Sequence, residues 1–212
     1  MTSTHTPPRG QRMPRSERRA QLLDAAQAVF VQSGYHAAAM DEIADRAGVT
    51  KPVLYQHFPG KLDLYLALLD THCDAIILKV RTAMLATPDN KERVKGAVRA
   101  YFDFVDHESE AFRLVFESDL TNDPAVREHV DRVTRECSAM IATVIHEDTD
   151  LPDAEARLLA VSLVGMAQVS ARFWLSEASG IKPLVTQGDA AALVAGLAWR
   201  GIRGYPRTDE HH

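Results

Sequence analysis

The sequence lacks the motifs that mark most enzymes and metal proteins. Its 212 residues include only two cysteines, Cys73 and Cys137, which form no C-x-x-C pair and no zinc-like spacing. The histidines show no metal-ligand spacing, and no H-E-x-x-H, G-x-S-x-G or G-x-x-x-x-G-K-[ST] motif occurs. We therefore expect no metal, no cofactor and no catalytic residues. An enzyme without a recognisable motif remains the alternative.

Long hydrophobic runs are also absent. No stretch reaches about 18 consecutive apolar residues, the length that a membrane-spanning helix needs. The first 19 residues, MTSTHTPPRGQRMPRSERR, contain no apolar segment of the kind found in secretory signals. The two cysteines lie far apart in helix-like segments, which is typical of partly buried free thiols in a reducing compartment. These features predict a cytoplasmic protein without a membrane partner.

No segment shows the alternation of a β-strand followed by a hairpin turn. Apolar residues instead recur at helical spacing, and the breaks between helical stretches carry Pro, Gly, Asp and Asn. The pattern predicts an all-α fold. We expect helices from a cap at Ser16 to Gly34, and over residues 40–47, 51–58, 61–86, 91–107, 109–118, 124–147, 152–178 and 186–203.

The net charge of −5 hides an uneven distribution of charge. Residues 1–61 carry eight Lys and Arg against five Asp and Glu, a balance of +3, whereas the remaining residues have a balance of −8. A basic head on an acidic body indicates that the head binds a polyanion. The alternative is a solvated face that happens to be basic, and charge alone does not separate the two.

Residues 40–59, MDEIADRAGVTKPVLYQHFP, predict two short helices joined by a tight turn at Gly48, which is a helix-turn-helix. The second helix would present its polar face and its N-terminal N–H groups to DNA. The alternatives are a solvated polar face, partial packing of two of the side chains, and a capping role for the first residue of the set. The predicted DNA contacts are Thr50, Lys51, Pro52, Val53, Tyr55, Gln56, His57 and Lys61.

This region resembles the TetR family of bacterial transcription regulators. The matching residues are Gly34-Tyr35, Ile43-Ala44, Ala47-Gly48-Val49, Lys51, Leu54-Tyr55, His57-Phe58, Lys61 and Leu64. Two positions depart from the family pattern: Ala39 stands where a Ser or Thr cap is usual, and Pro52 stands where a small residue is common. The resemblance implies a homodimer, formed by the last two long helices, that binds an inverted repeat in double-stranded DNA. It also implies a flexible basic arm at 1–14, a helix-turn-helix domain at 15–60, an effector-binding and dimerisation domain at 61–205 and a tail at 206–212.

Three longer segments resemble a subgroup, the actinobacterial fatty-acid-synthesis regulators of the FasR type. They are GYHAAAMDEIADRAGVTKPVLYQHFPGKLDLYLALL, AYFDFVDHESEAFRLVFESDL and LVGMAQVSARFWL. This resemblance implies a long-chain acyl-CoA effector and lipid-synthesis genes as targets. A different apolar effector, or a helical adaptor dimer that does not bind DNA, remains open. The residues expected at the effector, unless they are ordinary core, are Phe102, Val105, Phe112, Phe116, Met140, Val144, Met166 and Phe173.

Overall fold

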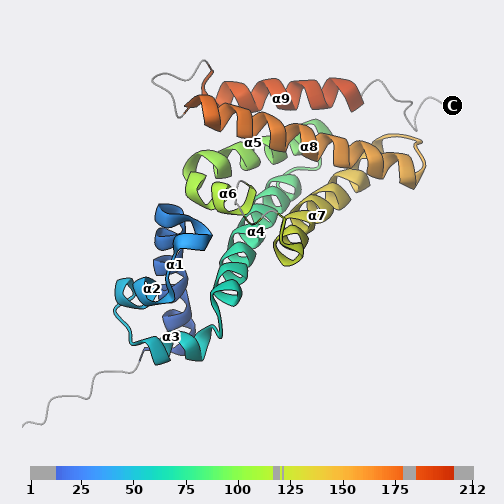
Figure 1. Ribbon diagram of the computed structural model, residues 1–212. Helices are drawn as coiled ribbons and strands as arrows, with labels where there is room; N and C mark the ends of the chain where they lie inside the picture. Colours follow the sequence, from blue (N-terminus) through green and yellow to red (C-terminus); the bar gives the residue numbers. More distant parts are fainter. Residues whose placement is uncertain (1–12, 117–119, 121, 179–184, 203–212) are drawn as a thin grey trace, which may run out of the picture. The chain divides into compact units, whose positions relative to one another are not determined.

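The computed structural model describes residues 13–116, 120, 122–178 and 185–202, and within these ranges it contains helices and no β-strand (Figure 1). This confirms the predicted all-α fold. The chain divides into two compact units, Met1–Tyr65 and Leu66–His212. The helices are α1 (Arg15–Ala37), α2 (Met40–Arg46), α3 (Lys51–His57), α4 (Lys61–Leu85), α5 (Asn90–His107), α6 (Ser109–Phe116), α7 (Pro124–Asp148), α8 (Asp153–Ala178) and α9 (Gln187–Ile202).

The first unit is a small three-helix domain in which α1 packs on α2 and α2 on α3. Apolar residues at helical spacing bring the three helices together around one core. The amide Nε2 of Gln21 also donates a hydrogen bond to the carbonyl oxygen of Ala47, at 2.8 Å, which ties α1 to the end of α2. The fully buried members of this core are Leu22, Ala26, Val29, Ile43 and Leu54.

An aromatic cluster decides where the first unit ends. Tyr65 is in the second turn of α4, and the centre of its ring lies 5.1 Å from the ring centres of both Phe30 and Tyr35. Tyr65 is 1% exposed. Because these rings hold the start of α4 against α1, the division falls between Tyr65 and Leu66, beyond the 60/61 boundary expected from the Pro59-Gly60 break.

Two glycines adopt the left-handed conformation that side chains disfavour. Gly34, with φ of 71°, kinks α1 where the sequence predicted the helix to end, and one further turn follows the kink. Gly48, with φ of 64°, reverses the chain between α2 and α3. The N–H groups of Gly48 and Val49 bond to the carbonyl oxygens of Asp45 and Ala44, so the turn is closed by the backbone.

In the second unit α7 packs along α8, and α5 packs along α9 and against α8. Figure 1 shows α8 and α9 running side by side. The helix α4 comes close to α5 at Gly96, where an added Cβ would lie 3.4 Å from the carbonyl oxygen of Ala83. Asp89 and Asp123 cap α5 and α7 by accepting hydrogen bonds from backbone N–H groups of the first turn. This part of the fold therefore places α4, α5, α7, α8 and α9 around one interior.

Candidate DNA-binding surface and effector cavity

The helix α3 has one buried and one exposed face. Leu54 is fully buried and fixes the helix on the core, while Val53 and His57 are half-buried. The exposed face therefore carries polar side chains next to the turn, as the sequence predicted for a recognition helix. Its members are Thr50, Lys51, Pro52, Tyr55 and Gln56. The side chain of Thr50 makes no capping hydrogen bond in α3, so the capping alternative for this residue is not supported.

Lys51 forms an ion pair on this face. Its ammonium lies 2.6 Å from a carboxylate oxygen of Asp41, and both side chains are more than half exposed. The hydrogen bond to Asp41, together with its charge, raises the pKa of Lys51, so the side chain is a cation at neutral pH. Exposed pairs of this kind contribute only about 0–1 kcal/mol. A phosphate group can therefore replace Asp41 as the partner of Lys51 at little cost.

His57 lies beside a cluster of arginines from the start of α1. Burial lowers the pKa of His57, and the charges of Arg15, Arg19 and Arg18 lower it further. Arg15 and Arg18 line a groove together with Met13, Val53, Gln56 and His57. This groove joins α1 to α3 in one basic surface. Sequence reasoning did not assign Arg18 to the site, although the basic run RSERR was the signal for it.

The structure gives Lys61 a role other than the predicted DNA contact. Its Nζ donates hydrogen bonds to the carbonyl oxygens of Tyr35, His36 and Ala38, at 2.8, 3.1 and 2.9 Å. The ammonium also lies 4.6 Å from the centre of the Tyr35 ring. These bonds use all three ammonium protons to cap the end of α1. With these bonds in place, Lys61 has no ammonium proton left for the predicted DNA contact.

The second unit contains an apolar cavity of about 60 Å³. Its wall is built by α4, α5, α7, α8 and α9, and its polar members are Tyr101, Cys137 and Gln168. Burial raises the pKa of Cys137 to about 12, so this thiol stays protonated and is not a nucleophile. The apolar wall residues are Val80, Met84, Val94, Ala97, Val98, Val133, Ile141, Val144, Ile145, Leu163, Val164, Ala167 and Ala198.

Of the eight residues predicted at the effector, Val144 lines this cavity. Phe102, Val105 and Phe112 are fully buried in the core and are not part of the cavity wall, and Phe173 is 64% exposed on the surface. Met140 and Met166 are half-buried and also lie outside the wall. The side chain of Phe116 lies outside the described residues. Helical spacing identified apolar faces, but it did not distinguish the residues that face the cavity from those that face another helix.

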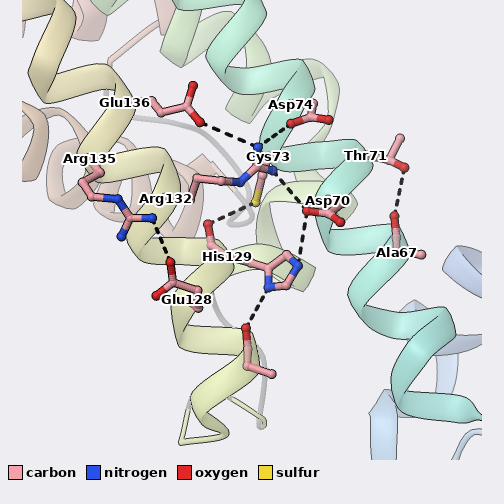
Figure 2. Close-up of polar contacts among 11 residues, drawn as sticks. Ala67, Asp70, Thr71, Cys73, Asp74, Glu128, His129, Arg132, Arg135 and Glu136 are labelled. Atoms are coloured by element: carbon pink, nitrogen blue, oxygen red, sulfur yellow. Dashed lines mark hydrogen bonds and ion pairs between the residues drawn. The ribbon is translucent and has the colours of Figure 1, made fainter.

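Polar side chains fasten α4 to α7 near this cavity (Figure 2). Arg132 of α7 contacts Asp74 at 2.7 Å and Asp70 at 3.2 Å, both on α4, and Glu136 on its own helix at 3.7 Å. His129 adds a contact to Asp70 at 3.2 Å. We call this set, comprising Asp70, Asp74, His129, Arg132 and Glu136, the α4–α7 clasp. It holds α4 and α7 together, and both helices contribute to the cavity wall.

The helices α8 and α9 expose apolar side chains. The segment Asp153–Ser176 is also the one stretch, among the described residues, that is long and apolar enough to cross a membrane by length and composition alone. Polar residues interrupt it, so the sequence showed no uninterrupted apolar run there. One such helix is weak evidence for a membrane. The exposed apolar residues are Leu158, Val161, Val169 and Phe173 of α8, and Leu193 and Leu197 of α9, and we call them the α8–α9 face.

Comparison with known proteins identifies the family. The family model "Bacterial regulatory proteins, tetR family" matches residues 22–68, and the model "Tetracyclin repressor-like, C-terminal domain" matches residues 90–200. The chain is also 47% identical over 201 residues to the HTH-type transcriptional activator FasR of Mycolicibacterium smegmatis. These aligned residues cover 94% of this chain and 90% of FasR. The chain belongs to the TetR family. It is therefore a DNA-binding transcription regulator, which confirms the predicted family and the prediction that the chain is not an enzyme.

Solved structures share the fold of this TetR-family protein. A TetR-like regulator from Rhodococcus sp. RHA1 superimposes with a TM-score of 0.72 at 25% identity, covering 91% of this chain and 100% of that one. The FadR regulator of Bacillus subtilis, solved in complex with stearoyl-CoA, superimposes with a TM-score of 0.67 at 18% identity, covering 87% of this chain and 98% of that one. The predicted architecture, with a helix-turn-helix followed by a helical domain, is confirmed.

Proposed function

We propose that this TetR-family protein is a cytoplasmic homodimer that binds an inverted repeat in DNA, responds to long-chain acyl-CoA and controls lipid-synthesis genes. The similarity to FasR over most of both chains supports the resemblance to the FasR-type subgroup, which implies lipid-synthesis genes as targets. The shared fold with a FadR that binds stearoyl-CoA supports an acyl-CoA as effector. On the DNA side, α3 would supply Lys51, Tyr55 and Gln56, and the start of α1 would supply Arg15 and Arg18.

The observation that carries the effector proposal is the course of α4. This helix begins in the first unit, with Lys61 and Tyr65, and continues into the second, where Val80 and Met84 line the cavity. A ligand that prefers a different position of α4 against α7 would therefore change the DNA-binding unit as well. By linkage, DNA must then change the affinity for the ligand by the same factor.

The size of the cavity bears on how a ligand enters. Ligand sites usually enclose about 300–1,000 Å³, whereas the cavity measures about 60 Å³. A C16–C18 chain would therefore bind only after the helices around the cavity separate. Because only the open molecules bind the ligand, the apparent affinity equals the affinity of the open form multiplied by the fraction of molecules that are open. Each methylene that is then buried adds about 0.8 kcal/mol.

Two experiments test this function. Selection of bound duplexes from random DNA identifies the operator, which we expect to be an inverted repeat. Acyl-CoAs of C8 to C20 are then titrated against the protein–operator complex, and the DNA affinity should change steeply with chain length. If long and short chains act equally, or none acts at micromolar concentration, the acyl-CoA proposal fails while the family assignment stands.

The small cavity favours a second candidate, which is a shorter apolar effector. This candidate would be supported if the effect on DNA affinity were greatest with the C8 chain.

A further inference from the structure

One residue of the cavity wall, Tyr101, has a buried hydroxyl group without a partner among the described residues. Tyr101 of α5 lines the cavity and is 6% exposed, and its hydroxyl makes no hydrogen bond to any of the residues that the structure describes. A buried polar group that lacks a partner is a free-energy penalty that folded proteins usually avoid. Because Tyr101 is also a wall residue, a ligand that opens the cavity would reach this group and could remove the penalty.

The surroundings of Tyr101 show what that partner must be. After burial, the groups that affect the ionisation of Tyr101 are Cys137, which also lines the cavity, and Arg172. Burial raises the pKa of Tyr101 far above its usual value, so the hydroxyl remains a proton donor at every physiological pH. The side-chain amide of Gln168, the other strongly polar group in the wall, already donates to Thr134 at 3.2 Å. Among the polar groups of the described wall residues, the hydroxyl of Tyr101 is therefore the buried one that lacks a partner.

We infer that the hydroxyl of Tyr101 donates a hydrogen bond to the carbonyl oxygen at the head of the effector's acyl chain. This inference rests on the proposed function and adds a chemical requirement to it: the effector carries an acceptor inside the cavity. An apolar chain with no carbonyl would fill the same space but leave the hydroxyl unpaired. Because a carbonyl oxygen is the polar atom nearest to the chain in both thioesters and free acids, either class meets the requirement.

Calorimetry with matched ligands tests this. Palmitoyl-CoA and S-hexadecyl-CoA have the same chain and the same CoA, but the second is a thioether and lacks the carbonyl. We expect the unmodified protein to bind the thioester about tenfold more tightly, as one buried hydrogen bond implies. Tyr101→Phe should bind the two ligands with equal affinity. Tyr65→Phe removes a hydroxyl from a tyrosine that is equally buried but lies in the first unit, and it should keep the tenfold preference.

Thermal unfolding provides a second readout. Tyr101→Phe should melt at a higher temperature than the unmodified protein when no ligand is present, because an unpaired buried hydroxyl is removed, yet palmitoyl-CoA should stabilise it less. Free palmitate, added as a third ligand, distinguishes a thioester from a free acid as the preferred source of the carbonyl.

The outcomes separate the two levels of the proposal. Equal binding of the thioester and the thioether by the unmodified protein overturns the role of Tyr101 and leaves the acyl-CoA proposal intact. An equal loss of affinity for both ligands in Tyr101→Phe shows a packing role and also overturns it. If neither CoA ligand binds the unmodified protein, the effector proposal fails and the inference fails with it.

Discussion

Some side chains in this protein make contacts that their position in the sequence does not predict. Lys61 stands at the start of α4, where its charge resembles a phosphate contact, but it bonds to carbonyl groups 23 to 26 residues earlier in the chain. Lys51, ten residues before it, has the exposure and the weak ion pair that DNA binding requires. Two lysines of the same unit are thus expected to differ in what their loss does.

Substituting these two lysines separates stability from DNA binding. Lys61→Met removes three charge-assisted bonds at the end of α1 and should lower the free energy of unfolding by about 1–3 kcal/mol. Lys51→Met should change the free energy of unfolding by less than about 0.5 kcal/mol. It should reduce DNA affinity, and it should lower the salt dependence of binding by the amount that corresponds to about one phosphate contact. Urea unfolding and binding at several salt concentrations measure both quantities. A normal unfolding midpoint in Lys61→Met, with a smaller salt slope, would restore this residue to the DNA contacts.

His72 gives the stability of the second unit a dependence on pH. It is buried, its Nε2 has no partner among the described residues, and burial lowers its pKa although Glu108 opposes the shift. Between this lowered pKa and the value of about 6.5 in the unfolded chain, the unfolded state binds more protons, so stability falls as the pH falls. The contribution is complete above pH 6.5 and is lost toward the folded pKa. His57, in the first unit, acts in the same direction.

Comparison of two histidine variants checks this assignment. His72→Leu should lose less stability between pH 7.5 and pH 5.5 than the unmodified protein does. His146→Leu changes an exposed histidine of the same unit and serves as the control, so its loss should match that of the parent. Urea unfolding at the two pH values provides the measurement. A steep loss that persists in His72→Leu would assign the acid sensitivity to other groups.

At the scale of the helices, the clasp joins α4 to α7, and we expect its strength to affect how easily the cavity opens. Arg132 connects two carboxylates of α4 to α7 and is 28% exposed. Arg135, one turn further along α7, pairs within the described part of the chain with Glu128 of the same helix, at 2.8 Å. The two arginines therefore differ in whether they join α4 to α7, which makes them a matched pair.

Loosening the clasp should help the effector. Arg132→Leu removes a contact that favours the closed arrangement, and a change of about 1 kcal/mol in that balance corresponds to about a fivefold change in affinity. We expect palmitoyl-CoA to bind Arg132→Leu several-fold more tightly than the unmodified protein, and Arg135→Leu to bind as the parent does. Calorimetry measures the three affinities. Weaker binding in Arg132→Leu would show that the clasp belongs to the ligand-bound state instead.

The helices were more predictable than the cavity for a physical reason. Their ends depend on local chemistry. Asp89 and Asp123 cap α5 and α7, and Gly48 makes the turn before α3, so the predicted starts of these three helices lie within one residue of the observed ones. A cavity wall depends on which helix a side chain meets. Tyr101 and Phe102 are neighbours on α5, yet the first lines the cavity and the second is core. No local signal in the sequence separates them.

At the scale of the whole molecule, the exposed α8–α9 face supports the proposed homodimer. Leu158, Val161 and Val169 repeat at helical spacing along α8, with Gly165 between them, and an added Cβ at Gly165 or Gly196 would meet no atom within 4 Å. Small residues between exposed apolar ones allow two helices to approach closely. Because one recognition helix reads only a half-site, a second copy that covers this face would supply the second half-site reader.

Charges placed on this face should separate the proposed dimer. In Val169→Glu/Leu193→Glu, four like charges would meet across the two-fold axis and the apolar burial would be lost. We therefore expect this variant to sediment at the 23.4 kDa mass of one chain, and the parent to sediment at twice that mass. Affinity for the inverted repeat should fall roughly 100-fold or more, because the two half-sites are no longer bound together. Palmitoyl-CoA binding should persist, because the cavity lies within a single chain.

Leu78→Glu, at an equally exposed apolar site on α4, is the control and should remain dimeric. Sedimentation equilibrium at micromolar concentration measures the masses, and a double variant that stays at twice the chain mass would place the interface on another surface.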